Sequence, residues 1–263
     1  MQNFADAIPA AIPRVALITG GARRLGRAIG LALADAGFAI AVHCHESEAA
    51  ARETAAEIAA RGVRSCVLRA DLSDEAQTAA LLARAAAELG PVGVLVNNAS
   101  TFERDDWDDV TKESWDRHMG PNLRAPFVLM QAFARDLPEA AEGVVINLLD
   151  QRVFSLTPHF ISYSLSKASL WALTQSLALA LAPRIRVAGI GPGPALPSPR
   201  QSQEQFDRQA QSLPLGHGTG EAEVGRAALS ILAMPAFTGQ MIALDGGQHL
   251  QWAPTRPGEP LEE

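Results

Sequence analysis

The segment from Val15 to Gly26 constrains the fold of this chain more than any other stretch of its sequence. Its first four residues are apolar and long enough for a buried β-strand. Gly20 and Gly21 follow, and a residue without a β-carbon lets the chain turn sharply. From Arg24 to Ala36 the apolar residues recur at helical spacing. This order of strand, turn and helix directs backbone N–H groups and the positive end of a helix at one point, which favours binding of a phosphate group.

The glycine pattern departs from the usual dinucleotide-binding fingerprint, which has three glycines. Gly20 and Gly26 are present, but Arg24 stands where the middle glycine is expected. Because a guanidinium group suits a phosphate, Arg23 and Arg24 are interpreted as a local anion-binding patch, although Arg24 as a solvated helix charge is the alternative. The formal net charge of −7 argues against a broad nucleic-acid-binding surface.

Short apolar runs and helical stretches alternate to the end of the chain. After the first strand, further strands are predicted over 38–42, 64–70, 92–96, 144–148, 185–190 and 241–244. Helices are predicted over 24–36, 48–60, 73–89, 112–137, 163–181 and 221–233, with Ser73 as a cap and strain near Gly120–Pro121. This alternation predicts an α/β fold: a Rossmann-like, doubly wound, seven-stranded parallel sheet with helices on both faces.

The sequence predicts a single domain over residues 1–263, with three less regular segments. Residues 1–13 are expected to form a loose leader and 253–263 a proline-rich tail. Residues 194–218, rich in Pro, Ser and Gln, are expected to form a substrate loop or lid. Neither a membrane span nor a secretion signal is evident, and two cysteines are too few for a disulfide framework. A cytoplasmic protein without membrane partners is therefore expected.

Polar residues and glycines follow the predicted strands at their carboxyl ends. Because ligands of parallel α/β sheets bind beyond these ends, the following positions are expected to converge on one crevice: Thr19-Gly20, His43, Asp71, Asn97-Asn98, Asp150 and Gly191 to Gly193.

Tyr163, the one tyrosine of the chain, and Lys167 stand four residues apart on a predicted helix and therefore share a face. An ammonium group near a phenol favours the phenolate, so the pair suits proton donation near neutral pH. A bare Tyr-x-x-x-Lys is more often an ordinary surface pair. Its place after the fifth strand, in a chain that begins with a dinucleotide turn, favours the catalytic interpretation.

Together these segments resemble the short-chain dehydrogenase/reductase family over about Arg14 to Leu250. The matching pieces are Thr19-Gly20 through Gly26, Asp71-Leu72, Asn97-Asn98-Ala99, Asn122, Tyr163 with Lys167, Pro192-Gly193, and Leu244-Asp245-Gly246-Gly247. The resemblance implies that Tyr163 donates a proton, that Lys167 holds the ribose and favours the phenolate, and that Asn122 helps to order a water and proton relay. It also implies a homotetramer or homodimer formed through the Tyr163 helix and the last strand.

Two departures from the family pattern occur together in its pteridine reductase branch. One is Arg24, and the other is Asp150, which stands thirteen residues before Tyr163 in place of a serine. That branch also carries Asn-Ala-Ser-x-Phe, matched here from Asn98 to Phe102, and the ending 244–250 resembles bacterial dihydromonapterin reductases. The resemblance implies that Phe102 stacks on a pterin ring and sandwiches it against nicotinamide. Alternatively, Asp150 caps a nearby loop and Phe102 belongs to the core.

NADP(H) is the expected cofactor. His43 stands at the end of the second strand, where an NAD enzyme would carry an acid, and Arg23-Arg24 can attract a 2′-phosphate. Glu46 counts against this choice, because the pteridine branch has a basic residue there. His43 and His45 lack a third ligand nearby, so no metal is expected. The predicted cofactor-binding residues are Gly20, Arg23, Arg24, Leu25, His43, His45, Ser47, Asp71, Leu72, Asn98, Ala99, Ser100, Tyr163, Lys167, Pro192 and Gly193.

The expected reaction is NADPH-dependent hydride transfer to a carbon–nitrogen double bond of a dihydropterin, with dihydromonapterin and dihydrofolate among the candidates. The predicted catalytic residues are Asp150, Tyr163, Lys167 and Asn122, and the predicted substrate-binding residues are Ser100, Phe102, Asp150 and Tyr163. One alternative is an NADPH-dependent reductase of ketones or 3-oxoacyl substrates, against which Asp150 in place of serine argues. The other is a non-catalytic NADP(H)-binding sensor or scaffold, which would not need Tyr163, Lys167 and Asn122.

Overall fold

The computed structural model describes residues 4–198 and 200–251. In these ranges seven strands form one parallel sheet in the order β3-β2-β1-β4-β5-β6-β7, which confirms the predicted fold class. The strands are β1 Val15–Ile18, β2 Ala39–Cys44, β3 Ser65–Arg69, β4 Val94–Asn97, β5 Gly143–Leu148, β6 Ile185–Pro192 and β7 Met241–Leu244. Because β1 lies between β2 and β4, the strand order reverses at the glycine-rich turn that follows β1.

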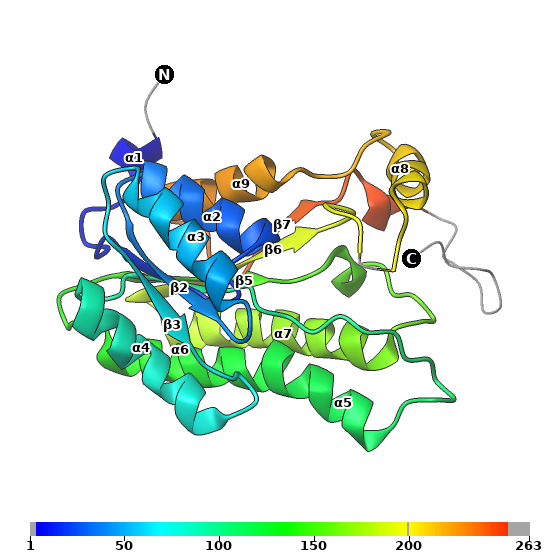
Figure 1. The fold of residues 1–263 in the computed structure, drawn as a ribbon, viewed down its shortest axis with the longest axis horizontal. Coiled ribbons are helices and arrows are strands. Elements are labelled where there is room, and N and C mark those ends of the chain that lie inside the picture. Colours follow the sequence, from blue (N-terminus) through cyan, green and yellow to red (C-terminus); the bar gives the residue numbers. More distant parts are fainter. Residues whose placement is uncertain (1–3, 199, 252–263) are drawn as a thin grey trace.

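Helices cover both faces of the sheet (Figure 1). One layer contains α1 Phe4–Ala7, α2 Arg24–Asp35, α3 Glu48–Ala59 and α9 Glu221–Ala233. The other contains α4 Glu75–Leu89, α5 Lys112–Met119, α6 Ala125–Asp136 and α7 Ile161–Ala180. The remaining helices are the π-helical turn η1 Gly120–Arg124, the short 3₁₀ turns η2 Gln151–Val153 and η3 Gln248–Leu250, and α8 Gln203–Gln211.

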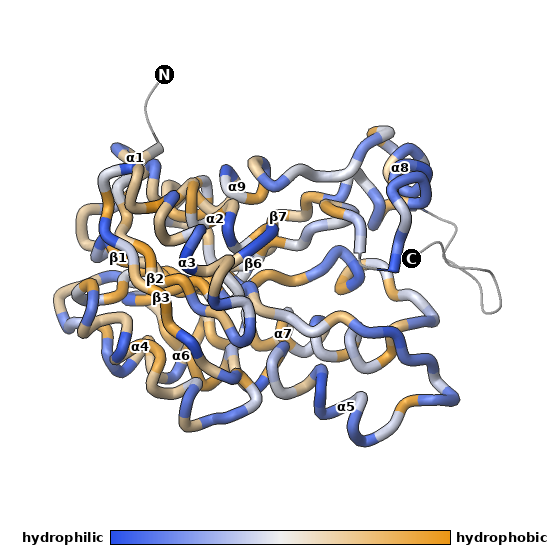
Figure 2. The backbone as a smooth tube through the Cα atoms, in the orientation of Figure 1, coloured by the Kyte–Doolittle hydropathy of each residue, from blue (hydrophilic) through white to orange (hydrophobic). Residues whose placement is uncertain are grey.

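The strands are apolar on both faces, as a buried parallel sheet requires. Successive side chains of a strand point to opposite faces, so β1 divides its residues between two cores. Ile18 packs in the core beneath α2, α3 and α9, and Leu17 packs in the core beneath α4, α6 and α7. Figure 2 shows this central apolar layer, with hydrophilic residues concentrated on the outer helices and loops.

The predicted long helix over 112–137 is interrupted. It consists of α5, the single π-helical turn η1 and α6, and the interruption contains Gly120 and Pro121. Proline cannot donate a backbone hydrogen bond, and a π-turn accommodates that missing donor. The strain expected near these residues is thus taken up by one widened turn, which carries the buried side chain of Asn122.

Asp74, not Ser73, caps α4. Its carboxylate accepts hydrogen bonds from the backbone N–H groups of Ala76 (2.9 Å) and Gln77 (3.1 Å). The Ser73 hydroxyl instead donates to Asp71 at 2.8 Å. An ionised carboxylate is a stronger acceptor than a hydroxyl, so it prevails at the positive end of the helix.

The expected loose leader contains structure in its described part. Residues 4–7 form α1, and the side chains of Ile8 and Ile12 are buried in the core beneath α2 and α9. The Arg14 guanidinium donates to the Ile8 carbonyl at 3.2 Å and fastens this segment. The burial of two isoleucines therefore overrides the lack of periodicity that indicated a leader. The predicted tail over 253–263 lies outside the described residues.

The segment 194–218 contains α8, which begins with a capping box. The Ser202 hydroxyl accepts from the Gln205 N–H at 3.2 Å, and the Gln205 side chain accepts from the Ser202 N–H at 2.8 Å. The segment expected to form a loop therefore contains a helix.

None of the helices in the described ranges has the length and apolar character that a bilayer-spanning helix needs.

We expect Gly26→Ala to destabilise the fold. A β-carbon at residue 26 would lie 2.4 Å from the Gly20 carbonyl oxygen and 2.5 Å from Asn98 Nδ2, so the glycine turn and β4 would have to separate. The predicted loss is about 2 kcal/mol of unfolding free energy or more, measured by urea denaturation. Gly30→Ala on the same helix is the control, because its nearest neighbour would be the flexible Ile18 Cδ1 at 3.3 Å. An equal loss for both variants would contradict this explanation.

Candidate active site

The carboxyl ends of the central strands enclose a cavity of about 610 Å³. Most of the predicted site residues line it: Gly20, Arg23, Arg24, Leu25, His43, His45, Asp71, Leu72, Asn98, Ala99, Ser100, Phe102, Asp150, Tyr163, Lys167, Pro192 and Gly193. Ser47 and Asn122 are not part of the wall. Parallel strands end at the same edge of a sheet, and this places residues from six separate strand ends around one space.

The glycine turn after β1 is held against the end of β4. Asn98 Nδ2 donates to the carbonyl oxygens of Thr19 (2.8 Å) and Gly20 (3.1 Å). In return, the Thr19 hydroxyl oxygen accepts from the N–H groups of Asn98 (2.9 Å) and Ala99 (3.0 Å). Gly20 has a φ of +61°, a conformation that favours glycine. These bonds give the turn a defined shape in the absence of a ligand.

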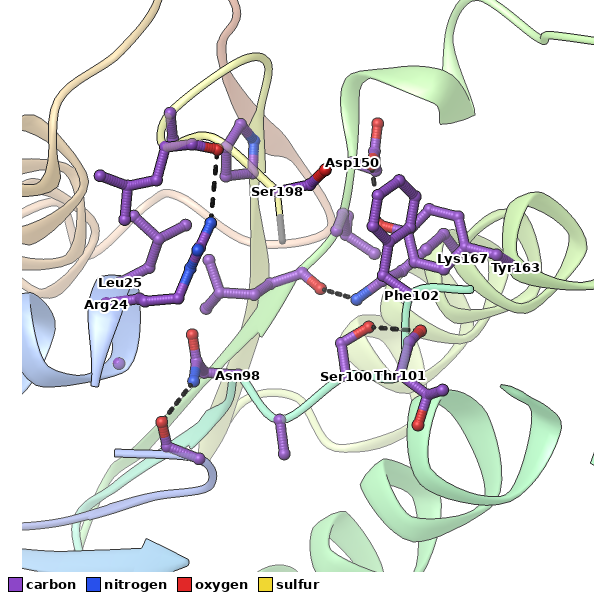
Figure 3. Close-up of a pocket in the computed structure, with 18 of the residues that line it drawn as sticks. Arg24, Leu25, Asn98, Ser100, Thr101, Phe102, Asp150, Tyr163, Lys167 and Ser198 are labelled. Carbon is purple, nitrogen blue, oxygen red and sulfur yellow. Dashed lines mark hydrogen bonds between the residues drawn. The ribbon is translucent and has the colours of Figure 1, made fainter. Parts of the chain in front are cut away.

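Arg24 keeps the backbone conformation of the glycine that it replaces. Its φ is +52°, in the left-handed region where a side chain is strained. Its guanidinium group donates to the carbonyl oxygens of Leu196 (3.3 Å) and Pro197 (3.1 Å), as Figure 3 shows for one of these bonds. Arg24 therefore connects the glycine turn to the segment 194–218 across the cavity.

His43 supports the turn and has no ring N–H available for an anion. Its Nδ1 accepts from the Gly20 N–H at 3.1 Å, so the proton is on Nε2, which donates to the Ala70 carbonyl at 3.1 Å. Burial lowers the pKa of His43 to about 4 and keeps the ring neutral at physiological pH. Both ring nitrogens of His43 are thus paired within the protein. The neighbouring His45 is exposed, 3.9 Å from Asp71 Oδ2.

Tyr163, Asp150 and Lys167 meet at the far side of the cavity (Figure 3). The Tyr163 hydroxyl donates to Asp150 Oδ2 at 2.8 Å, and Lys167 Nζ donates to the Leu148 carbonyl at 2.7 Å. Burial lowers the pKa of Lys167 to about 8, although the charge of Asp150 acts in the opposite direction. The ammonium lies 5.9 Å from the centroid of the Tyr163 ring. The phenol is therefore flanked by a carboxylate acceptor and a buried cation.

Asp150 also caps the short turn η2. Its Oδ1 accepts from the Arg152 N–H at 2.8 Å, and the Arg152 guanidinium lies 3.4 Å from Oδ2. The alternative of a capping carboxylate and the predicted contact with Tyr163 are thus both realised by one side chain. Arg152 places a positive charge beside this buried carboxylate, which offsets the cost of removing it from water.

Phe102 forms part of an aromatic wall. Its ring stacks on Phe160 with 4.8 Å between centroids and meets Tyr163 edge-on at 4.7 Å. Arg200 from the segment 194–218 lies 5.2 Å from the Phe102 ring centroid and donates to the Phe102 carbonyl at 3.3 Å. Phe102 therefore packs against a buried ring, as the core alternative required, and also lines the cavity.

Asn122 holds the chain segment that carries Phe102. Its Oδ1 accepts from the Thr101 N–H at 2.8 Å, and its Nδ2 donates to the Thr101 carbonyl and to Ser166 Oγ, both at 3.0 Å. The Asn122 amide lies outside the cavity wall and clamps the segment that leads to Phe102.

A buried carboxylate anchors the start of α7, the helix that carries Tyr163. Asp105 Oδ1 accepts from the Ser162 N–H at 3.0 Å, and Oδ2 accepts from the hydroxyls of Ser162 and Ser114. His118 Nδ1 lies 2.6 Å from the Ser162 oxygen, and burial lowers the pKa of His118. The positive end of α7 stabilises this carboxylate. Asp105 and His118 carry no signal in the sequence that would reveal this contact.

Several residues of the cavity wall were missed by the sequence analysis, among them Thr101, Gln151, Arg152, Ser198 and Gln248. Gln151 and Arg152 directly follow Asp150, and adjacency was the one signal that could have found them. Ser198 lies between Arg24 and Asp150 in the view of Figure 3. In the described ranges, His, Cys, Asp and Glu side chains form no group of three or more that could hold a metal ion.

Comparisons with known proteins identify the family of this chain. A family model described as short chain dehydrogenase matches residues 14–208. FolM alternative dihydrofolate reductase 1 from Brucella canis, complexed with NADP, has a TM-score of 0.90 and 44% identity, covering 95% of this chain and 99% of that chain. The corresponding protein of Brucella suis, in complex with NADP, has a TM-score of 0.89 and 46% identity, covering 93% and 98%.

Among curated relatives, 2-dehydro-3-deoxy-D-gluconate 5-dehydrogenase of Dickeya dadantii is 35% identical over 167 residues, which is 63% of this chain. The chain spans 64% of the length of that relative, slightly less than two thirds.

At residue 24, where the backbone is left-handed, we expect a glycine variant to be more stable than an alanine variant. This is the reverse of the usual order within a helix. Both Arg24→Gly and Arg24→Ala lose the bonds to the segment 194–218, but only glycine relieves the strain at a φ of +52°. The glycine variant should therefore be about 1 kcal/mol more stable in urea denaturation. At Arg27 on the same helix the alanine variant should be the more stable of the two by about 1 kcal/mol. The same order at both positions would contradict the assignment of strain.

Proposed function

Because this chain belongs to the short-chain dehydrogenase family, we propose that it is an NADPH-dependent oxidoreductase that reduces a dihydropterin-type substrate. The observation that carries the proposal is the hydrogen bond from Tyr163 to Asp150 at 2.8 Å, in a cavity that Phe102 also lines. The similarity to the two FolM reductases with bound NADP supports it.

The residues at the glycine turn fit a dinucleotide. Gly20 and Gly26 let the turn pack tightly against Asn98 and Ala99, and α2 directs its positive end at the same point. Arg23 and Arg24 are exposed and line the cavity, and both bring positive charge toward phosphate groups, while the Arg24 guanidinium also donates to the segment 194–218. We propose that these residues, with Asn98 and Lys167, hold the cofactor. When bound, NADPH supplies the hydride.

Selectivity for the 2′-phosphate would arise at the end of β2. His45 is exposed there, and Ser47, the residue before α3, makes no side-chain capping bond, so both can donate to an anion. Glu46 is exposed and can turn its carboxylate into solvent. The neutral, buried His43 contributes by shaping the turn.

Proton transfer falls to Tyr163. Its hydroxyl gives a proton to the substrate, and the phenolate that remains is stabilised by the Lys167 ammonium. Asp150 accepts the hydroxyl hydrogen bond beforehand and so orients the phenol, while Arg152 balances the charge of Asp150. Phe102 offers an aromatic face to a flat ring. Together these side chains position a planar substrate beside its proton donor.

The nature of Asp150 disfavours a ketone or 3-oxoacyl reductase. In such a reductase a serine hydroxyl donates a hydrogen bond to the substrate carbonyl. Here Asp150 Oδ2 accepts a bond from Tyr163 and faces the Arg152 guanidinium, so it does not supply that donor. A nitrogen heterocycle, which carries N–H groups of its own, is the better match for a carboxylate.

We also propose that the protein acts as a homo-oligomer in the cytoplasm. On the outer side of α5 and α6 a second cavity of about 620 Å³ is lined by apolar side chains that include Met119, Leu123 and Phe127. Such a surface suits a symmetric partner, as a homotetramer or homodimer would provide. The thiols of Cys44 and Cys66 are free, as expected in a reducing compartment.

We expect the purified protein to oxidise NADPH in the presence of dihydropterins, followed by the loss of absorbance of the reduced nicotinamide. The panel is dihydrobiopterin, dihydromonapterin, dihydrofolate and several ketones. Tyr163→Phe should lower the rate at least about 100-fold, the usual scale of acid–base catalysis, and Asp150→Asn should change the pH profile. Preference for ketones would support a carbonyl reductase, and binding of NADPH without any turnover would support a sensor or scaffold.

Turnover should decrease as the pH rises through about 8. The pKa of Lys167 lies near this value, and above it the ammonium becomes a neutral amine that no longer stabilises the Tyr163 phenolate. The measurement is kcat between about pH 6 and pH 10, with circular dichroism at each pH to show that the fold persists. A kcat that stays constant to about pH 10 would contradict the assigned role of the ammonium.

A further inference from the structure

Gln151 is a buried polar side chain that the mechanism above does not use. It follows Asp150 at the start of η2, lines the same cavity and is 7% exposed. Its Oε1 is shielded from solvent and has no hydrogen-bond partner among the residues that the structure describes. A buried carbonyl oxygen without a partner is costly, so its presence in a native fold calls for an explanation.

Two asparagine amides at or beside the cavity are occupied by the protein itself. Asn98 Nδ2 donates to Thr19 and Gly20, and the Asn122 amide is committed to Thr101 and Ser166. Gln151 differs from these two, because its buried Oε1 accepts no hydrogen bond from any described group. Its neighbour Asp150 accepts the hydrogen bond of Tyr163, so this acceptor belongs to the residue next to the partner of the proton donor.

A carboxamide presents an acceptor oxygen and a donor nitrogen side by side. This pair matches a ring edge on which a donor and an acceptor are adjacent, as glutamine and asparagine match the edge of adenine. The 2-amino-4-oxo-pyrimidine half of a pterin has such edges, whereas a simple ketone has only an acceptor. The aromatic face of Phe102 in the same cavity suits a planar ring of this kind.

We propose that Gln151 is a substrate-binding, specificity-determining residue whose carboxamide hydrogen-bonds the donor–acceptor edge of a planar nitrogen heterocycle. This inference rests on the proposed function and adds to it the residue that separates pterins from carbonyl compounds. Gln151 takes no part in proton transfer, so its loss should weaken binding of the heterocycle and leave the chemistry of Tyr163 in place.

The test uses the full chain with NADP⁺ and the fluorescent oxidised ring compound pterin, so that binding is measured without turnover. Gln151→Met keeps the length of the side chain and removes both hydrogen-bonding groups. Gln151→Glu keeps the shape and the acceptor and removes the donor. Gln131→Met, on the exposed face of α6 and outside the cavity wall, is the matched control.

Both Gln151 variants should raise the Kd of pterin about 10- to 100-fold, because a buried polar group that loses its hydrogen-bond partner costs binding free energy of this order. The Kd of NADPH should stay within about twofold, and the KM for dihydropterins should rise far more than kcat falls. Gln131→Met should match the wild type in every respect. If Gln151→Met does not fold, Gln151→Glu decides the question.

Pterin binding by a folded Gln151 variant as tight as in the wild type would overturn the inference and leave the proposed function intact. Failure of the wild type itself to bind pterin or reduce any dihydropterin would overturn the proposed function, and the inference with it. A parallel loss of NADPH and pterin binding would show that Gln151 is a packing residue and would equally overturn the inference.

Discussion

The parallel pairing of β1 with β4, and of β4 with β5, is the constraint on which the rest of the site depends. The register places Ile18 beside Val96 and Asn97 beside Asn147, so the three strands end at one level. Everything that follows these ends enters the same space: the glycine turn, Asn98 and Asp150. The apolar side chains on both faces of the strands hold this register, since any shift would move them out of the two cores.

The second requirement is that α7 begins next to the cavity at the carboxyl ends of the strands, so that its first turns reach the site. Tyr163 lies in its first turn, and Lys167 follows one turn later, buried against the Leu148 carbonyl. The Asp105 carboxylate anchors the start of the helix from a distant loop, through the backbone and the hydroxyl of Ser162. A lysine so deeply buried is costly, which is why its pKa falls. This cost falls at the position where the proposed mechanism needs the Lys167 ammonium beside the Tyr163 phenol.

Arg24 shows how a departure from a familiar motif is accommodated. The turn still requires a left-handed residue, and the arginine adopts that conformation at the expense of backbone strain. In exchange, a guanidinium group stands between the glycine turn and residues 196–197 of the opposite segment. Arg200 of the same segment makes a comparable contact to the Phe102 carbonyl. Two arginines therefore connect the segment to the glycine turn and to the chain that carries Phe102.

The sequence by itself determined the order of strands and helices, the fold class and most of the cavity wall. Apolar periodicity reflects the repeat of each backbone conformation, so it is visible locally, and the ends of parallel strands must converge whatever the side chains are. Tyr163 and Lys167 could be paired for the same reason, because four residues form about one helical turn.

The tertiary structure alone decided how the side chains at these positions are used. Four features depend on which groups packing brings within hydrogen-bond distance. They are the neutral ring of His43, the clamp made by Asn122, the pairing of Arg152 with Asp150 and the unpartnered amide oxygen of Gln151. The distances between residues far apart in the chain cannot be read from one sequence alone. Burial likewise appears only once the chain has closed, and it sets the pKa of Lys167 and of His43.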